Sequence, residues 1–211
     1  MIKHVIFDFD GTIVDSRALI VKFYNEFASS NGYKEIKLEE IEHLSTMSIP
    51  DRCKLLEIPL YTIPKMALNA KKKYREAIPT LKAFEGIGDL IRVMKSAGLD
   101  ISIISSNGFY NIKTFLQYND LDIFDNIFSS RNLFGKQYKI NSFLKNFNLA
   151  KGDVIYIGDE LRDIVACRKS GVKIISVSWG WDSGQLLFAN NPDFLANKPS
   201  EILGAIKSLS S

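Results

Sequence analysis

The stretch HVIFDFDGT, residues 4–12, decides the fold. It begins with a short apolar, β-branched run that ends directly at Asp8, which is typical of a strand buried on both faces of a parallel sheet. In an extended chain Phe9 points opposite to its neighbours, so the carboxylates of Asp8 and Asp10 share one side. Gly11 then permits a sharp turn. The stretch therefore predicts a strand that carries two acids to the edge of a sheet.

Three further apolar runs also end on polar residues. They are residues 101–104 before Ser105, Ser106 and Asn107, residues 154–157 before Gly158 and Asp159, and residues 172–177 before Ser178. Apolar residues at helical spacing, in residues 87–94 and 140–147, separate these runs. Strands that alternate with helices predict an α/β fold with a Rossmann-like, doubly wound parallel sheet. In such sheets ligands bind at the carboxyl ends of the strands.

Residues 15–79 interrupt this alternation. They carry two apolar stripes at helical spacing and several prolines, but no strong strand run. We therefore expect a small helical cap domain over residues 15–79, inserted after the first strand. Residues 1–14 and 80–211 would form the Rossmann-like catalytic core.

Two pairs of side chains carry a weaker signal. Arg17 and Arg52 lie in the expected cap, and we expect both on exposed surface rather than facing a substrate. Trp179 and Trp181 follow the last strand run, where aromatic packing is a commoner role than lining a crevice. We assign neither pair to a site.

Composition excludes several classes of protein. The 211 residues are 46% hydrophobic and 24% charged, which is ordinary for a globular protein, and the net charge of +3 gives no reason to expect a nucleic-acid or membrane partner. No apolar run is long enough to span a bilayer, and no signal peptide is evident. The two cysteines form no CxxC pair and suit a reducing compartment. We expect a cytoplasmic protein.

Four acids should gather at the carboxyl ends of the strands. Asp8 and Asp10 follow one strand, Asp159 follows another, and Asp163 lies one helical turn after Asp159. Carboxylates this close repel one another and require a cation. Mg²⁺ fits, because it prefers oxygen ligands, keeps waters and accepts a phosphate oxygen. A lysine from the turn at Gly135 would complete the charge balance.

The motifs that carry these residues resemble the signatures of the haloacid dehalogenase-like hydrolases. Residues 8–16, DFDGTIVDS, are similar to the first signature, Ser105 to the second, a lysine near Lys136 to the third, and residues 158–163, GDELRD, to the fourth. The resemblance covers nearly the whole chain and includes the helical insertion. The general layout is similar to phosphoglycolate phosphatase relatives within the family.

The resemblance implies roles for the four acids. Asp8 would attack phosphorus and form an aspartyl-phosphate, and Asp10 would protonate the leaving oxygen and then activate water. Mg²⁺ would bind the carboxylates of Asp8 and Asp159 and the backbone carbonyl of Asp10, with Asp163 in support. Carboxylates are known covalent nucleophiles, which agrees with this reading.

The phosphate-binding residues are less closely defined. The resemblance implies that Ser105 and a lysine hold phosphate oxygens. Ser106 replaces Ser105 if the strand runs one residue longer, and Asn107 either contacts substrate or caps the helix that begins near residue 109. Lys136 follows the turn-forming glycine and is preferred, with Lys139 as the alternative, because the segment lacks the Lys-Pro of many relatives.

Three other activities compete with hydrolysis of a phosphate ester. Dehalogenases of this family lack the second aspartate, so the presence of Asp10 argues against them. A phosphomutase needs a cap that retains and reorients an intermediate, and a non-turnover phospho-acceptor has no need for an acid/base residue beside the acceptor. We therefore predict a Mg²⁺-dependent phosphatase of a small phosphorylated metabolite. The substrate and the oligomeric state stay open.

Overall fold

The computed structural model describes residues 2–129 and 135–210. Six parallel strands form one sheet in the order β3-β2-β1-β4-β5-β6. The strands are β1 (His4–Phe7), β2 (Asp100–Ser105), β3 (Asn126–Ser129), β4 (Val154–Gly158), β5 (Lys173–Val177) and β6 (Phe194–Ala196). The chain winds outward from β1 to β3, returns to β4 and then continues outward on the other side. The predicted α/β fold with a doubly wound parallel sheet is confirmed, and β1 and β4 flank its switch point.

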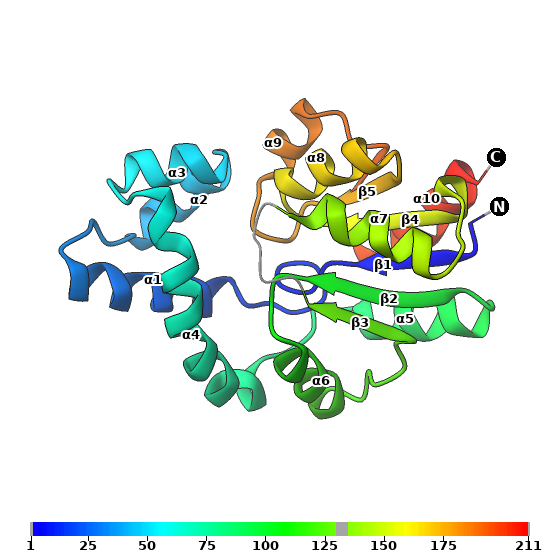
Figure 1. Ribbon diagram of the computed structural model, residues 1–211, viewed down its shortest axis with the longest axis horizontal. Helices are drawn as coiled ribbons and strands as arrows, with labels where there is room; N and C mark the ends of the chain where they lie inside the picture. Colours follow the sequence, from blue (N-terminus) through cyan, green and yellow to red (C-terminus); the bar gives the residue numbers. More distant parts are fainter. Residues whose placement is uncertain (1, 130–134, 211) are drawn as a thin grey trace.

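The sheet is buried on both faces by helices. The six that flank it are α5 (Ile87–Ser96), α6 (Phe109–Tyr118), α7 (Lys136–Asn146), α8 (Leu161–Ser170), α9 (Gly184–Ala189) and α10 (Ile202–Leu209). Val5 and Phe7 of β1 pack in one apolar cluster with residues of α5, α6 and α10. Ile6 packs on the opposite face with α7, α8 and α9. The alternation along β1 thus fills both layers, and Figure 1 shows α7, α8 and α9 on one side of the strands with α5 and α6 on the other.

Two edge strands were not predicted. β3 pairs with β2, and β6 pairs with β5 over three residues. Both are short, and the residues of β3 are only half-buried, so neither carries a long apolar run. Pairing in the folded chain, rather than local sequence, defines these two strands.

Four helices fill most of the segment between β1 and α5. They are α1 (Arg17–Asn31), α2 (Ile41–Ser45), α3 (Ile49–Leu55) and α4 (Ile63–Ala77). Their apolar side chains form a separate cluster that includes Tyr24, Phe27 and Leu44. Figure 1 shows this helical unit beside the end of the sheet toward which the strands point. Phe23 and Tyr74 belong to the same helical unit, but their side chains pack in the main core of the sheet domain.

Short 3₁₀ turns connect several of these elements. They are Leu38–Glu40, Leu60–Thr62, Ile78–Thr80, Lys151–Asp153 and Pro199–Glu201. Among the described residues, no helix has both the length and the apolarity needed to cross a membrane.

Candidate active site

Asp8 lies at the carboxyl end of β1 and is almost fully buried, with 1% of its surface exposed. Its Oδ1 accepts a hydrogen bond from the Phe9 backbone N–H at 2.8 Å, and its Oδ2 accepts one from Lys136 Nζ at 2.8 Å. Phe9 points to the other side, where its ring packs edge-on against Phe115 with centroids 5.2 Å apart. The alternation expected from residues 8–10 therefore holds in the structure.

Lys136 is the first residue of α7 and is 3% exposed. Its ammonium donates to the carboxylates of Asp8 and Asp163. Burial lowers the pKa of Lys136, but the charges of Asp163 and Asp8 outweigh burial and raise the pKa above its usual value, so the side chain stays cationic. Lys139, the alternative in the sequence analysis, is exposed. Of the two lysines, the structure brings Lys136 to the acids.

Asp10 is held by three donors from separate parts of the chain. Its Oδ1 accepts from Ser16 Oγ at 2.8 Å and from Tyr74 OH at 2.6 Å, and its Oδ2 accepts from Asn107 Nδ2 at 2.9 Å. Burial raises the pKa of Asp10, while these hydrogen bonds oppose the rise. Tyr74 belongs to α4, so the helical unit touches this acid directly. Sequence reasoning missed Tyr74, because nothing local relates it to a residue 64 positions away.

Asp159 follows β4 and is fully buried. Its carboxylate accepts from Thr12 Oγ1 at 2.8 Å and from the Trp181 backbone N–H at 2.7 Å. Burial, followed by the nearby charges of Glu160 and Asp8, raises its pKa well above the usual range. Gly11 has φ +78°, and a Cβ there would lie 2.1 Å from Asp159 Oδ2. The turn that follows the first two acids thus also makes room for the third.

Asp8 and two further carboxylates form a potential cation site. Within the described ranges, ligand atoms of Asp8, Glu160 and Asp163 lie within 4.8 Å of one another. Burial raises the pKa of Asp163 to about 6, and the Lys136 charge works against this rise. Glu160 forms an ion pair with Arg162. Sequence reasoning did not select Glu160, whose only signal was its place beside Asp159, and the side chains of Asp10 and Asp159 are not part of this group.

The predicted phosphate-binding residues lie at the end of β2. Ser105 is its last residue, so the strand does not extend to Ser106. Ser105 is buried and its Oγ accepts the Asn107 N–H at 3.1 Å, whereas Ser106 is half-buried. Gly108, not Asn107, is the N-cap of α6. Asn107 instead donates to Asp10, which joins the end of β2 to the acids after β1.

The loop after β5 joins the helical unit to this site. Arg52 of α3 forms a buried ion pair with Asp182, and its Nε donates to the Leu44 carbonyl at 2.8 Å. The expectation that Arg52 is exposed is wrong, because Asp182 supplies a buried counter-charge. Asp182 also accepts the Leu161 N–H at 2.6 Å, at the start of α8. Arg17 was also expected on exposed surface but is half-buried; its guanidinium carbon lies 6.0 Å from the centroid of the Trp181 ring.

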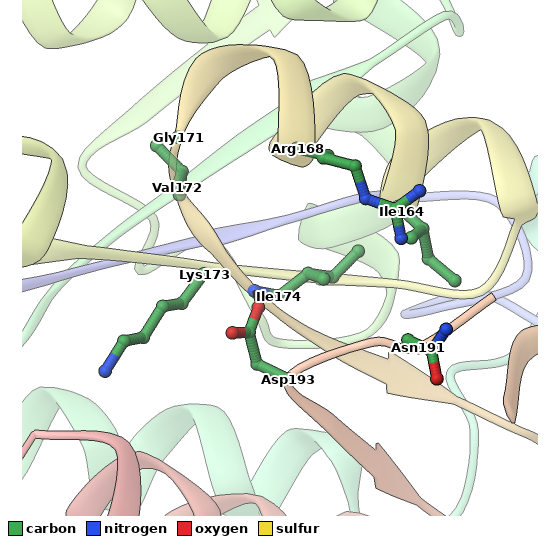
Figure 2. A pocket seen from close by; sticks show the side chains of 8 residues that line it. All are labelled: Ile164, Arg168, Gly171, Val172, Lys173, Ile174, Asn191 and Asp193. Carbon is green, nitrogen blue, oxygen red and sulfur yellow. Dashed lines mark hydrogen bonds between the residues drawn. The ribbon is translucent and has the colours of Figure 1, made fainter.

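A cavity of about 260 Å³ lies elsewhere in the molecule. Its lining residues come from α8 and the turn that follows it, the start of β5 and the segment before β6, as Figure 2 shows. The three charged side chains there all have hydrogen-bond partners: Arg168 donates to the Asn190 carbonyl, Lys173 donates to the Leu209 carbonyl, and Asp193 accepts the Ile174 N–H. The cavity is at the amino end of β5, away from the acids described above.

The fold and these side chains define an α/β enzyme with an acidic centre at the switch point of a parallel sheet. A model of the haloacid dehalogenase-like hydrolases matches residues 5–177, and the chain belongs to this family. The predicted class of enzyme, a hydrolase of this family that acts on phosphate esters, is confirmed.

Relatives cover almost the full length of the chain. It is 30% identical to a phosphoglycolate phosphatase from Synechococcus elongatus over 206 residues, which span 97% of each protein. It is 22% identical to the pyrophosphatase PpaX from Bacillus cereus, covering 99% of this chain and 98% of that protein. Among solved structures, a haloacid dehalogenase-like family hydrolase from Streptococcus pneumoniae has a TM-score of 0.80 at 22% identity, covering 97% and 98%. That structure shares the fold.

Proposed function

We propose that this chain is a Mg²⁺-dependent phosphatase that hydrolyses a small phosphorylated metabolite through an aspartyl-phosphate on Asp8. The observation that carries the proposal is the setting of Asp8. It lies buried at the end of β1, its carboxylate is held by Lys136 at 2.8 Å, and a second acid follows two residues later. A fixed carboxylate next to an acid/base group fits covalent catalysis at phosphorus.

The proposed reaction has two steps. An Asp8 carboxylate oxygen attacks phosphorus, the bond to the leaving oxygen breaks, and Asp10 gives its proton to that oxygen. Asp10 then takes a proton from water as the water attacks the aspartyl-phosphate, which releases inorganic phosphate and regenerates both carboxyl groups. In this proposal Lys136, which contacts Asp8, and the buried Ser105 hold phosphate oxygens, which serves a reaction governed by positioning and charge stabilisation.

The acids of the site fit a divalent cation. Asp8, Glu160 and Asp163 offer hard oxygen donors within 4.8 Å of one another, and their three negative charges are only partly offset by Lys136 and Arg162. We propose that these three carboxylates bind Mg²⁺. The family resemblance implies two further ligands, the Asp159 carboxylate and the Asp10 backbone carbonyl. Bound there, Mg²⁺ supplies the positive charge that lets a phosphate dianion approach and polarises its oxygens.

Removal of the cation should abolish activity. Hydrolysis of a simple aryl phosphate should vanish in chelator, because the acids would repel a phosphate dianion. Mg²⁺ should restore it, whereas Ca²⁺ should support it poorly since Ca²⁺ prefers a higher coordination number. Phosphate release, measured in each condition, tests this, and full activity in chelator would rule out a metal-dependent mechanism.

The relatives suggest the kind of substrate. Two of them are a phosphoglycolate phosphatase and a pyrophosphatase. We therefore propose a phosphorylated substrate about as small as phosphoglycolate or pyrophosphate. Both names describe hydrolases, which favours hydrolysis over a phosphomutase reaction. Phosphate release from a panel of phosphorylated metabolites in the presence of Mg²⁺ would identify the substrate.

We also propose that residues 15–79 act as a cap domain over a core of residues 1–14 and 80–211. Three facts support this division. The unit has its own apolar cluster, Tyr74 reaches Asp10, and Arg52 reaches Asp182. The two connections run side by side, with the Asp15 N–H donating to the Lys82 carbonyl at 3.1 Å.

Replacing residues 17–76 with a short Gly/Ser linker should leave a folded sheet domain. Loss of Phe23 and Tyr74 from the main core should lower its stability by roughly 3–6 kcal/mol, at 1.5–3 kcal/mol for each buried side chain. Turnover of the natural substrate should collapse, while small aryl phosphates are still cleaved slowly. Circular dichroism and phosphate release check both points, and an unfolded product would show that the insertion belongs to the main core.

A further inference from the structure

Among the described residues, four cationic side chains lie at the site or contact residues that bind its acids, and three of them are paired with carboxylates. Lys136 contacts Asp8 and Asp163, Arg52 contacts Asp182, and Arg162 contacts Glu160. Arg17 differs. Within residues 2–129 and 135–210 its guanidinium has no carboxylate within 4 Å, and it lies over the ring of Trp181.

Arg17 is placed next to two residues that bind the site's acids. It directly follows Ser16, whose hydroxyl donates to Asp10 at 2.8 Å. The aromatic residue beneath it, Trp181, donates its backbone N–H to Asp159 at 2.7 Å. Arg17 also begins α1, so it lies at the junction between the helical unit and the sheet.

Among the described residues, no carboxylate forms an ion pair with Arg17. The side chain is half-buried, and Arg52, whose guanidinium carbon is 5.4 Å from the centroid of the same ring, is already neutralised by Asp182. Asp10 is held by three other donors. An anionic group of a ligand would supply the missing charge, and a guanidinium matches a carboxylate or phosphoryl group with two parallel hydrogen bonds.

We propose that Arg17, supported by the Trp181 ring, binds a second anionic group of the substrate. Preferred substrates are then short phosphate compounds that also carry a carboxylate or a second phosphoryl group. The inference rests on the proposed function, because it places the reacting phosphoryl group at Asp8. Arg17 acts on specificity, since it would hold the part of the substrate that does not react.

The test compares two substrates that differ in one group. The values of kcat/KM for 2-phosphoglycolate and for ethyl phosphate, which lacks the carboxylate, are measured for the unaltered enzyme and for Arg17→Met. The variant should reduce the preference for 2-phosphoglycolate by about 10- to 100-fold, which is the range for loss of a charge-assisted hydrogen-bonded contact. Arg17→Lys should retain part of the preference. Arg92→Met, which alters an exposed arginine of α5, should leave it unchanged.

A binding measurement separates this inference from the proposed function. Calorimetry on the Asp8→Asn protein, with Mg²⁺, compares the same two compounds with and without Arg17→Met. Tighter binding of 2-phosphoglycolate that depends on Arg17 supports the inference, even if no phosphate ester is turned over and the proposed function fails. Equal loss for both compounds, no preference at all, or no detectable binding of either would overturn it.

Discussion

The Asp8→Asn variant should lose turnover of every phosphate ester, by on the order of 10⁴- to 10⁶-fold, which is the range for removal of a catalytic nucleophile. An amide cannot attack phosphorus, so no covalent intermediate forms. The fold should survive, because asparagine has nearly the same shape and its carbonyl oxygen can still accept from Lys136 or Phe9. Phosphate release at saturating Mg²⁺ measures the effect.

Asp89→Asn provides the matched control for this variant. Asp89 is an exposed acid of α5 whose side chain is 88% accessible, so the same chemical change there should leave turnover intact. If Asp8→Asn kept more than a few per cent of the normal rate with a native circular dichroism spectrum, Asp8 would not be the nucleophile.

Asp10→Asn should also cripple turnover, by about 10²- to 10⁴-fold, which is typical for loss of general acid–base catalysis. No side chain would then protonate the leaving oxygen or activate water. The loss should shrink with an activated aryl phosphate, whose leaving group needs little protonation. Rates for a series of aryl phosphates with leaving groups of different pKa measure this dependence.

The packing around Asp10 affects the interpretation of this variant. The new amide nitrogen would replace one of the two oxygens that accept from Ser16, Tyr74 and Asn107, so we expect a loss of stability of about 1–3 kcal/mol from the lost acceptor. Thermal unfolding should therefore accompany the kinetics. An equal loss of rate for poor and activated leaving groups would argue against an acid–base role and for simple distortion of the site.

The central strands and their acids were predictable because the signal is local. β1, β2, β4 and β5 are apolar runs that end on polar residues, and parallel pairing brings those ends together. The edge strands β3 and β6 were missed because they are short and only partly buried. Their pairing depends on contacts between segments distant in the chain.

The same distinction applies to the site. Asp8 and Lys136 meet as expected, since each lies directly at the end of a strand or the start of a helix. The contacts between the helical unit and the site could not be predicted from the sequence. The hydrogen bond from Tyr74 to Asp10 joins residues 64 positions apart, and the ion pair of Arg52 with Asp182 joins residues 130 positions apart. No local pattern relates either pair.

The most direct test of covalent catalysis at Asp8 is mass spectrometry of the intact protein. Asp10→Asn should accumulate the intermediate, because an activated substrate still transfers its phosphoryl group while hydrolysis is slow. After a rapid quench the protein should carry one added phosphoryl group, and peptide mapping should place it on Asp8. A label on Ser105, or a label on the Asp8→Asn protein, would contradict the proposed mechanism.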